Sequence, residues 1–322
     1  MNRFHDVPVF NSAENTDDIP YLQIINSNEA SLETITKALK ENKLLLVKGV
    51  NIASSGALFN LLVEHYDLKS SYDIQMQLVV HMMEGRESVD NLAVTVNERD
   101  TLQYIQAHSE GDSTSPLELF GLHCEVNAKQ GGENILSLVN QSADFSHLLA
   151  KEKVIVGENL SQKDIMTLRR AHMDATEVQA TMPNNAQVIQ QGTKGAVVVG
   201  TMPLEPSRSV INDESVYTLW DNVTVHDHGF HRHQFELLKH LDLLKGSDNA
   251  TYSDYMHVEH DSYWAPADTN SGDVAKTSSL FSCHVVHKMD AGDLLIFNNK
   301  TWAHSVNNWP EGEQRKLSAM YA

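Results

Sequence analysis

Cysteine is nearly absent from this chain. Among 322 residues there are two cysteines, Cys124 and Cys283, so a disulfide framework is excluded and a reducing, cytoplasmic environment is expected. Long apolar runs are also missing, because no stretch approaches the roughly 18 uninterrupted apolar residues of a membrane helix. The first residues, MNRFHD, lack a basic stretch followed by an apolar run, so we expect no signal peptide.

Basic residues are scarce relative to acidic ones. The chain has 24 lysines and arginines against 43 aspartates and glutamates, a net charge of −19. Such a surface repels phosphate backbones and anionic lipid headgroups, so we expect a small-molecule substrate rather than nucleic acid or a membrane. Glycine-rich phosphate loops and the GxSxG nucleophile motif are missing from the sequence, which gives nucleotide-binding and serine-hydrolase chemistry no support.

The order of apolar patterns predicts a mainly β protein with added helices. The first third alternates strands, expected at 21–25 and 43–50, with helices that begin near Ser31 and cover 57–66. After a polar loop at 109–116 come short strand-like runs at 119–123, 134–139, 194–202, 216–219, 282–287, 293–297 and 315–321. Helical patterns at 142–150, 161–172 and 233–244 interrupt them.

Many short strands separated by turns favour a sandwich, a barrel or a jelly roll. We expect one domain over residues 1–322, because the sequence shows no internal repeat and no long linker. Within it, residues 1–115 form an N-terminal α/β elaboration, and residues 116–322 form the β core with a helical insert.

The tripeptide His123-Cys124-Glu125 is a candidate for half of a metal site. In a strand, residues i and i+2 point to the same face, so His123 and Glu125 could reach one ion. Two histidines and one carboxylate form the facial ligand set of Fe(II) oxygenases, which leaves coordination positions open. The alternative is a polar pair at the tip of a loop.

The C-terminal segment supplies the other half. A turn and apolar strand, AGDLLIFNN at 291–299, lead to His304, and Arg315 follows after ten intervening residues. By alternation Arg315 shares a face with Leu317 and Ala319, and an inward face would place it beside His304. A buried arginine suits a cosubstrate that carries a carboxylate. A surface position is the alternative for Arg315.

The order Gly-Asp-Leu-Leu-Ile-Phe-Asn-Asn, histidine, ten residues, arginine resembles the C-terminal signature of Fe(II)/2-oxoglutarate-dependent dioxygenases. It is most similar to the taurine dioxygenase-like superfamily, which includes clavaminate synthase-like enzymes. The resemblance covers most of the chain and implies a double-stranded β-helix (jelly roll) core. It implies Fe(II) bound by His123, Glu125 and His304, with Arg315 holding 2-oxoglutarate, and O2 as the oxidant.

Two departures accompany the resemblance. Where the family often has Gly-Gly-Asp-Thr, this chain has Gly-Gly-Glu-Asn at 131–134, and the stretch follows His123 more closely than usual. Asn134 would replace the threonine that contacts the cosubstrate, since its amide donates hydrogen bonds. A glutamate ligand is typical of the clavaminate synthase-like group, which often acts on amino acids, whereas the ten-residue gap to Arg315 is typical of the taurine dioxygenase pattern.

The implied activity is oxidation of an unactivated C–H bond by hydroxylation, desaturation or oxidative cyclisation. The expected substrate is an amino acid or an amino-acid-derived intermediate of natural-product biosynthesis. Trp302, two residues before His304, would share its face and line the substrate pocket, or belong to the core.

Two other functions remain as hypotheses. The histidine-rich stretch 226–233 contains an HxH pair, His226 and His228, which could bind zinc in a hydrolase. It could instead be a polar loop or helix start near the mouth of the active site, or contribute to substrate binding. The third hypothesis is a non-catalytic jelly-roll binding protein, against which the retention of all four matched residues argues.

Overall fold

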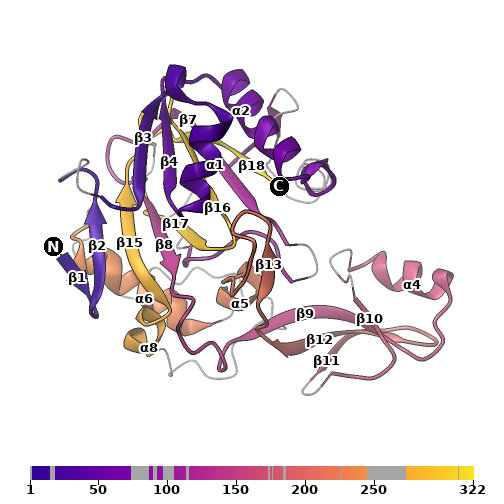
Figure 1. Ribbon diagram of the computed structural model, residues 1–322. Helices are drawn as coiled ribbons and strands as arrows, with labels where there is room; N and C mark the ends of the chain where they lie inside the picture. The colour runs from indigo at the N-terminus through magenta and orange to yellow at the C-terminus, as the bar shows by residue number, and fades with distance from the viewer. Residues whose placement is uncertain are drawn as a thin grey trace.

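The computed structural model of the chain shows two large β-sheets with helices on their outer faces (Figure 1). It describes residues 2–14, 19–73, 87–89, 93–96, 105–113, 116–172, 175, 177–183, 186–225, 227–244, 273–310 and 312–322. No helix among these residues is long and apolar enough to cross a membrane.

The larger sheet has seven strands in the order β3-β4-β16-β7-β18-β6-β5. Their bounds are β3 Leu22–Asn26, β4 Leu44–Lys48, β5 Ser88–Val89, β6 Ala93–Thr95, β7 Leu119–Val126, β16 Leu294–Asn298 and β18 Lys316–Tyr321. The short helix η1 (Ser27–Glu29) and the helices α1 (Leu32–Lys40) and α2 (Ile52–His65) belong to the N-terminal part. Ser31 and Asn51 cap α1 and α2 by accepting backbone hydrogen bonds, as capping residues do.

The smaller sheet has five strands in the order β1-β2-β15-β8-β17. Their bounds are β1 Asn2–Phe4, β2 Val7–Asn11, β8 Asn134–Val139, β15 Phe281–His287 and β17 Trp302–Val306. The helices α6 (His228–His240) and α8 (Val274–Ser278) lie beside it (Figure 1). Phe235, Leu237 and Leu238 of α6 pack with Ile135 of β8 and Val286 of β15.

The main core lies between the two sheets. Alternate residues of β7 face into it, namely Phe120, Leu122 and Cys124. From the smaller sheet it receives Leu136, Leu138, Cys283, Val285 and Trp302. The other face of the seven-stranded sheet packs against α1 and α2 through a second cluster that contains Leu119, Ile35 and Phe59. Apolar side chains therefore lie on both faces of β7, as expected for a central strand covered on both sides.

A four-stranded sheet extends from this body as an arm (Figure 1). Its strands, in the order β10-β9-β12-β11, are β9 Leu149–Val156, β10 Glu177–Gln179, β11 Gln187–Gln191 and β12 Ala196–Pro203, and α4 (Gln162–Arg169) packs on it. The hairpin of β13 (Ser207–Ser209) and β14 (Glu214–Val216) and the short helix α5 (Asp221–Thr224) lead back to the body. This arm corresponds to the helical insert expected from the sequence, but strands make up most of it.

Most predicted elements coincide with observed ones, and two do not. The helix expected at 142–150 is absent, because that segment forms turns before β9 begins at Leu149. The side chains of Asn140 and Asp144 accept hydrogen bonds from the backbone N–H groups of Ser142 and Ser146, and such local bonds compete with helix formation. The strand expected at 216–219 is also wrong, since β14 ends at Val216.

The N-terminal part contributes to both large sheets. Strand β2 pairs in parallel with β15, and β4 pairs antiparallel with β16. Strands β2 and β4 therefore extend the two sheets that contain the C-terminal strands β15 and β16.

Candidate functional site

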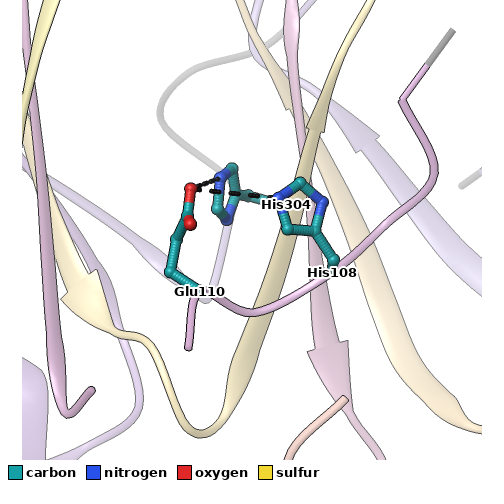
Figure 2. A group of neighbouring side chains, drawn as sticks. All are labelled: His108, Glu110 and His304. Atoms are coloured by element: carbon teal, nitrogen blue, oxygen red, sulfur yellow. Dashed lines mark ion pairs between the residues drawn. The ribbon is translucent and has the colours of Figure 1, made fainter. Parts of the chain in front are cut away.

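Three side chains that could bind a metal ion meet beside β17: His108, Glu110 and His304. Their ligand atoms lie within 4.8 Å of one another, and Figure 2 shows the Glu110 carboxylate approaching both imidazole rings. Glu110 Oε1 is 3.9 Å from His108 Nε2 and 3.7 Å from His304 Nε2. Two ligands each about 2.1 Å from one ion can be at most about 4.2 Å apart, and both distances lie within that limit.

Backbone pairing brings the two histidines together. His108 N–H donates to His304 C=O at 3.0 Å, and His304 N–H donates to His108 C=O at 2.7 Å. This isolated antiparallel bridge lies outside the named strands on the His108 side, and it brings the two ring centroids to 4.6 Å. Ser109 is fixed in the same way, since its N–H donates to Leu219 C=O and its C=O accepts from Asp221 N–H.

Hydrogen bonding and charge set the protonation of the two imidazoles. His108 Nδ1 lies 2.9 Å from the carbonyl of Gln106, so an Nδ1–H tautomer leaves Nε2 free to bind a metal. Burial disfavours the charged ring, but the carboxylates of Glu110 and Asp221 outweigh it and raise the pKa of His108 to about 9. Burial, together with the charge on His108, lowers the pKa of His304 to about 3.

Aromatic side chains line the inner side of the His304 ring. Phe120 lies 4.5 Å from it, centroid to centroid, and Phe297 lies 5.8 Å from it. Tyr321 packs on Phe120 in turn. The outer side is accessible, because the Glu110 side chain is 26% exposed. One carboxylate and two imidazoles on a half-open face form a donor set that fits Fe(II) with positions left for other ligands.

Arg315 and Asn134 form a second polar feature in the interior. Arg315 is buried, and its Nη2 lies 3.4 Å from Asn134 Oδ1. Its guanidinium stacks over the Trp309 ring at 4.9 Å. Burial lowers the pKa of Arg315 to about 10, which leaves it charged at neutral pH. Arg315 Nε and Asn134 Nδ2 are buried without a hydrogen-bond partner among the described residues, an arrangement that fits an anionic ligand.

The strand register relates this pair to His304. On β8, Leu136 lies opposite His304 and Asn134 lies opposite Val306. Asn134 is thus two residues, about 7 Å, along the strand from the partner of His304 and on the same face. A short dicarboxylate could therefore reach from the metal ligands to the Arg315 guanidinium.

His123 and Glu125, predicted from the sequence as metal ligands, do not lie with His304. They do share one face of β7, but that face is the outer one. His123 Nε2 lies 3.2 Å from the carbonyl of Val50, next to the helical layer. The Glu125 side chain is 56% exposed and pairs with Lys316. Cys124 is the residue that faces the interior, and the His-x-Glu pair that lies beside His304 is His108 and Glu110.

A signal for the His108–Glu110 pair was present in the sequence. The tripeptide His108-Ser109-Glu110 has the same His-x-Glu pattern, 15 residues (123 minus 108) before the predicted one. This tripeptide was not recognised as a candidate, because it overlaps the polar segment that was interpreted as a loop. The unusually short interval from His123 to the glycine pair at 131–132 disappears when His108 is the first ligand.

The glycine pair lets the chain pass close to Arg315. Gly132 has φ +72°, and a Cβ there would lie 2.6 Å from Asn127 Oδ1 and 3.4 Å from Arg315 Cδ. A Cβ on Gly131 would lie 1.9 Å from the carbonyl oxygen of Asn308. Glycine is therefore required at both positions for the loop before Asn134 to pack against Arg315.

The remaining predicted site residues are placed as follows. Trp302 is fully buried in the main core and donates from Nε1 to the carbonyl of Asn42, which matches the core alternative. His226 lies outside the described residues, so the HxH hypothesis is not tested. His228 is the first residue of α6, which Asp227 caps. The stretch therefore includes a helix start, as one of the two alternatives expected.

Comparisons with known proteins find similarity in structure alone. No family model matches the chain, and no curated protein sequence matches it. Solved structures with a similar arrangement include AAD-2 in complex with Mn(II) and N-oxalylglycine (TM-score 0.44, 11% identity, 94% of this chain and 95% of that one). Others are a taurine dioxygenase from Burkholderia xenovorans (0.41, 13%, 94% and 82%) and PvcB, an Fe, alpha-ketoglutarate dependent oxygenase from an isonitrile synthetic pathway (0.42, 12%, 94% and 82%).

Proposed function

We propose that the chain is a non-haem Fe(II)/2-oxoglutarate-dependent oxygenase built as a single domain on a double-stranded β-helix. The observation that carries the proposal is the His108–Glu110–His304 group, with Asn134 two residues along β8 from the partner of His304 and Arg315 in contact with Asn134. A metal ion alone would not require a buried arginine at that place. A cosubstrate with two carboxylates would use both features.

Each residue has a role in this proposal. His108, Glu110 and His304 would hold Fe(II) on one face, which supplies the activation of O2 coupled to oxidative decarboxylation of 2-oxoglutarate. Arg315 would bind the far carboxylate of 2-oxoglutarate through paired N–H groups, and Asn134 Nδ2 would donate a further hydrogen bond. Phe120 and Phe297 keep water from the inner side of His304.

The substrate is proposed to be a small molecule, an amino acid or a compound derived from one. The support is the glutamate in the carboxylate position, which the clavaminate synthase-like resemblance associates with such substrates. Glu110 now occupies that position in place of Glu125. Hydroxylation is the default outcome, and desaturation and cyclisation share the same hydrogen-abstraction step.

The direct test is turnover of the cosubstrate. Purified protein with Fe(II), 2-oxoglutarate and O2 should release succinate slowly by itself and faster with the correct member of an amino-acid library. Arg315→Ala should reduce succinate formation at low 2-oxoglutarate, and Lys316→Ala serves as the control, because Lys316 pairs with exposed Glu125. Absence of any 2-oxoglutarate consumption by the iron-loaded protein across the library would reject the proposal.

A further inference from the structure

Asn299 occupies the turn between β16 and β17, five residues before His304. It is fully buried, and its side chain uses both polar atoms. Oδ1 accepts from the backbone N–H of Glu110 at 3.0 Å. Nδ2 donates to the backbone carbonyls of Glu110 and Leu117, each at 2.9 Å. One amide therefore binds both backbone polar groups of Glu110.

These side-chain hydrogen bonds take the place of the backbone hydrogen bonds that a neighbouring strand would form with Glu110. The antiparallel bridge between His108 and His304, continued by two residues, would place Glu110 opposite Trp302. The N–H and carbonyl of Glu110 instead form hydrogen bonds with the Asn299 side chain. The Ser109 hydroxyl donates to the carbonyl of Trp302 at 3.3 Å. The backbone N–H and carbonyl of Glu110 are thus held by a side chain instead of by a neighbouring strand.

We propose that Asn299 is a positioning residue for the Glu110 carboxylate, an inference that rests on Glu110 being a metal ligand. Fixing the N–H and C=O of one residue restricts its backbone dihedrals and hence the direction of its Cα–Cβ bond. That direction brings the Glu110 carboxylate to 3.7 and 3.9 Å from the two imidazoles. An amide does this without adding charge, because it offers one acceptor and two donors.

Asn299 is itself held firmly by its surroundings. Its backbone N–H donates to the carbonyl of Glu118 at 2.8 Å. The next residue, Lys300, forms a buried ion pair with the Glu118 carboxylate at 3.2 Å. The preceding residue, Asn298, donates to Asn212 Oδ1 in the β13–β14 hairpin at 2.6 Å. The turn that carries Asn299 is therefore anchored on both sides. The hydrogen bonds from the Asn299 side chain then fix the backbone of Glu110 relative to this turn.

The test separates positioning from general stabilisation. Asn298 is a matched control, because it is the adjacent buried asparagine, at the end of β16, with three side-chain hydrogen bonds, none of them to Glu110. Mn(II) affinity would be measured by the loss of the free-ion electron paramagnetic resonance signal, without turnover. Wild type, Asn299→Ala, Asn299→Asp, Asn298→Ala and His108→Ala would be compared in conditions where circular dichroism shows each to be folded.

The expected result is that both Asn299 variants bind Mn(II) about 10- to 100-fold more weakly than wild type, the range for groups that orient metal ligands, whereas Asn298→Ala stays within about threefold. Asn299→Asp keeps the shape and an acceptor but loses both donors, so it provides the test if Asn299→Ala does not fold. Equal affinities for the Asn299 and Asn298 variants would overturn the positioning role. Wild-type affinity in His108→Ala would instead overturn the metal site itself.

Discussion

Two His-x-Glu tripeptides within the described residues occupy different environments. His123-Cys124-Glu125 lies in β7, in the middle of a seven-stranded sheet, with the histidine against the helical layer and the glutamate in solvent. His108-Ser109-Glu110 lies outside the named strands and is held by isolated bridges at His108 and Ser109, yet the side chains of His108 and Glu110 meet His304. The difference shows that membership of a regular strand does not make a His-x-Glu pair a candidate ligand pair. What matters is whether both side chains point toward the third candidate ligand, His304.

The largest contrast is expected for metal binding itself. His108→Ala and Glu110→Ala each remove a ligand atom, so both should weaken Mn(II) binding by more than about 100-fold, beyond the roughly 10- to 100-fold typical of outer-shell changes. His123→Ala should leave Mn(II) affinity at the wild-type value. Isothermal titration calorimetry under anaerobic conditions measures all three. Loss of affinity in His123→Ala together with full affinity in His108→Ala would reverse the comparison.

The second contrast concerns the cosubstrate pocket. Arg315→Ala removes a charge-assisted pair worth about 1.5–3 kcal/mol, so 2-oxoglutarate binding should fall by about 10- to 100-fold while Mn(II) binding persists. Asn134→Ala removes one neutral donor and should cost about fivefold. Equilibrium dialysis with labelled 2-oxoglutarate measures both. If Asn134→Ala weakened binding more than Arg315→Ala, the assignment of the carboxylate to Arg315 would be wrong.

The affinity for a metal ion should depend on pH through the tripeptide that contains His108. The pKa of His108 is raised to about 9 in the metal-free protein, so the ring is charged at pH 7 and has to lose its proton to bind a metal ion. Raising the pH removes this competing proton, and Mn(II) affinity should rise about tenfold per pH unit up to about pH 9.

Calorimetry in buffers of different ionisation enthalpy measures the number of protons released when the metal ion binds. About one proton per metal ion is expected from wild type and from His123→Ala at pH 7. Release of no proton by either protein would contradict the charged state of His108.

The smallest effect is expected for Glu125. Its ion pair with Lys316 joins two exposed side chains, and exposed pairs contribute about 0–1 kcal/mol. Glu125→Ala should therefore change neither metal affinity nor the urea midpoint beyond about 0.5 kcal/mol of stability. A large loss of either would give this glutamate a role that its exposure does not support.

The sequence predicted one half of the candidate site and missed the other for a physical reason. The strand before His304 and the strand after Arg315 are apolar runs whose positions follow from hydrophobicity, and the structure confirms both strands as β16 and β18. Alternation along β7 correctly put His123 and Glu125 on one face. It could not say which face is inner, because Leu119 and Phe120, on opposite faces, are both buried.

His108 and Glu110 could not be found by periodicity at all. They belong to no strand of their own, and their positions depend on contacts with residues about 190 positions later, His304 and Asn299. Such long-range pairing leaves no local pattern, so the polar stretch at 109–116 reads as a loop. The available signs were the His-x-Glu pattern of 108–110 itself and the short interval from His123 to the glycines at 131–132.

Anaerobic titration of Fe(II) with 2-oxoglutarate tests the central claim most directly, because chelation of Fe(II) by this cosubstrate gives a visible charge-transfer absorption band. The band should form in wild type and in His123→Ala, and it should be lost in His108→Ala at the same concentrations. A band that persists in His108→Ala, or one that disappears in His123→Ala, would contradict the site described here.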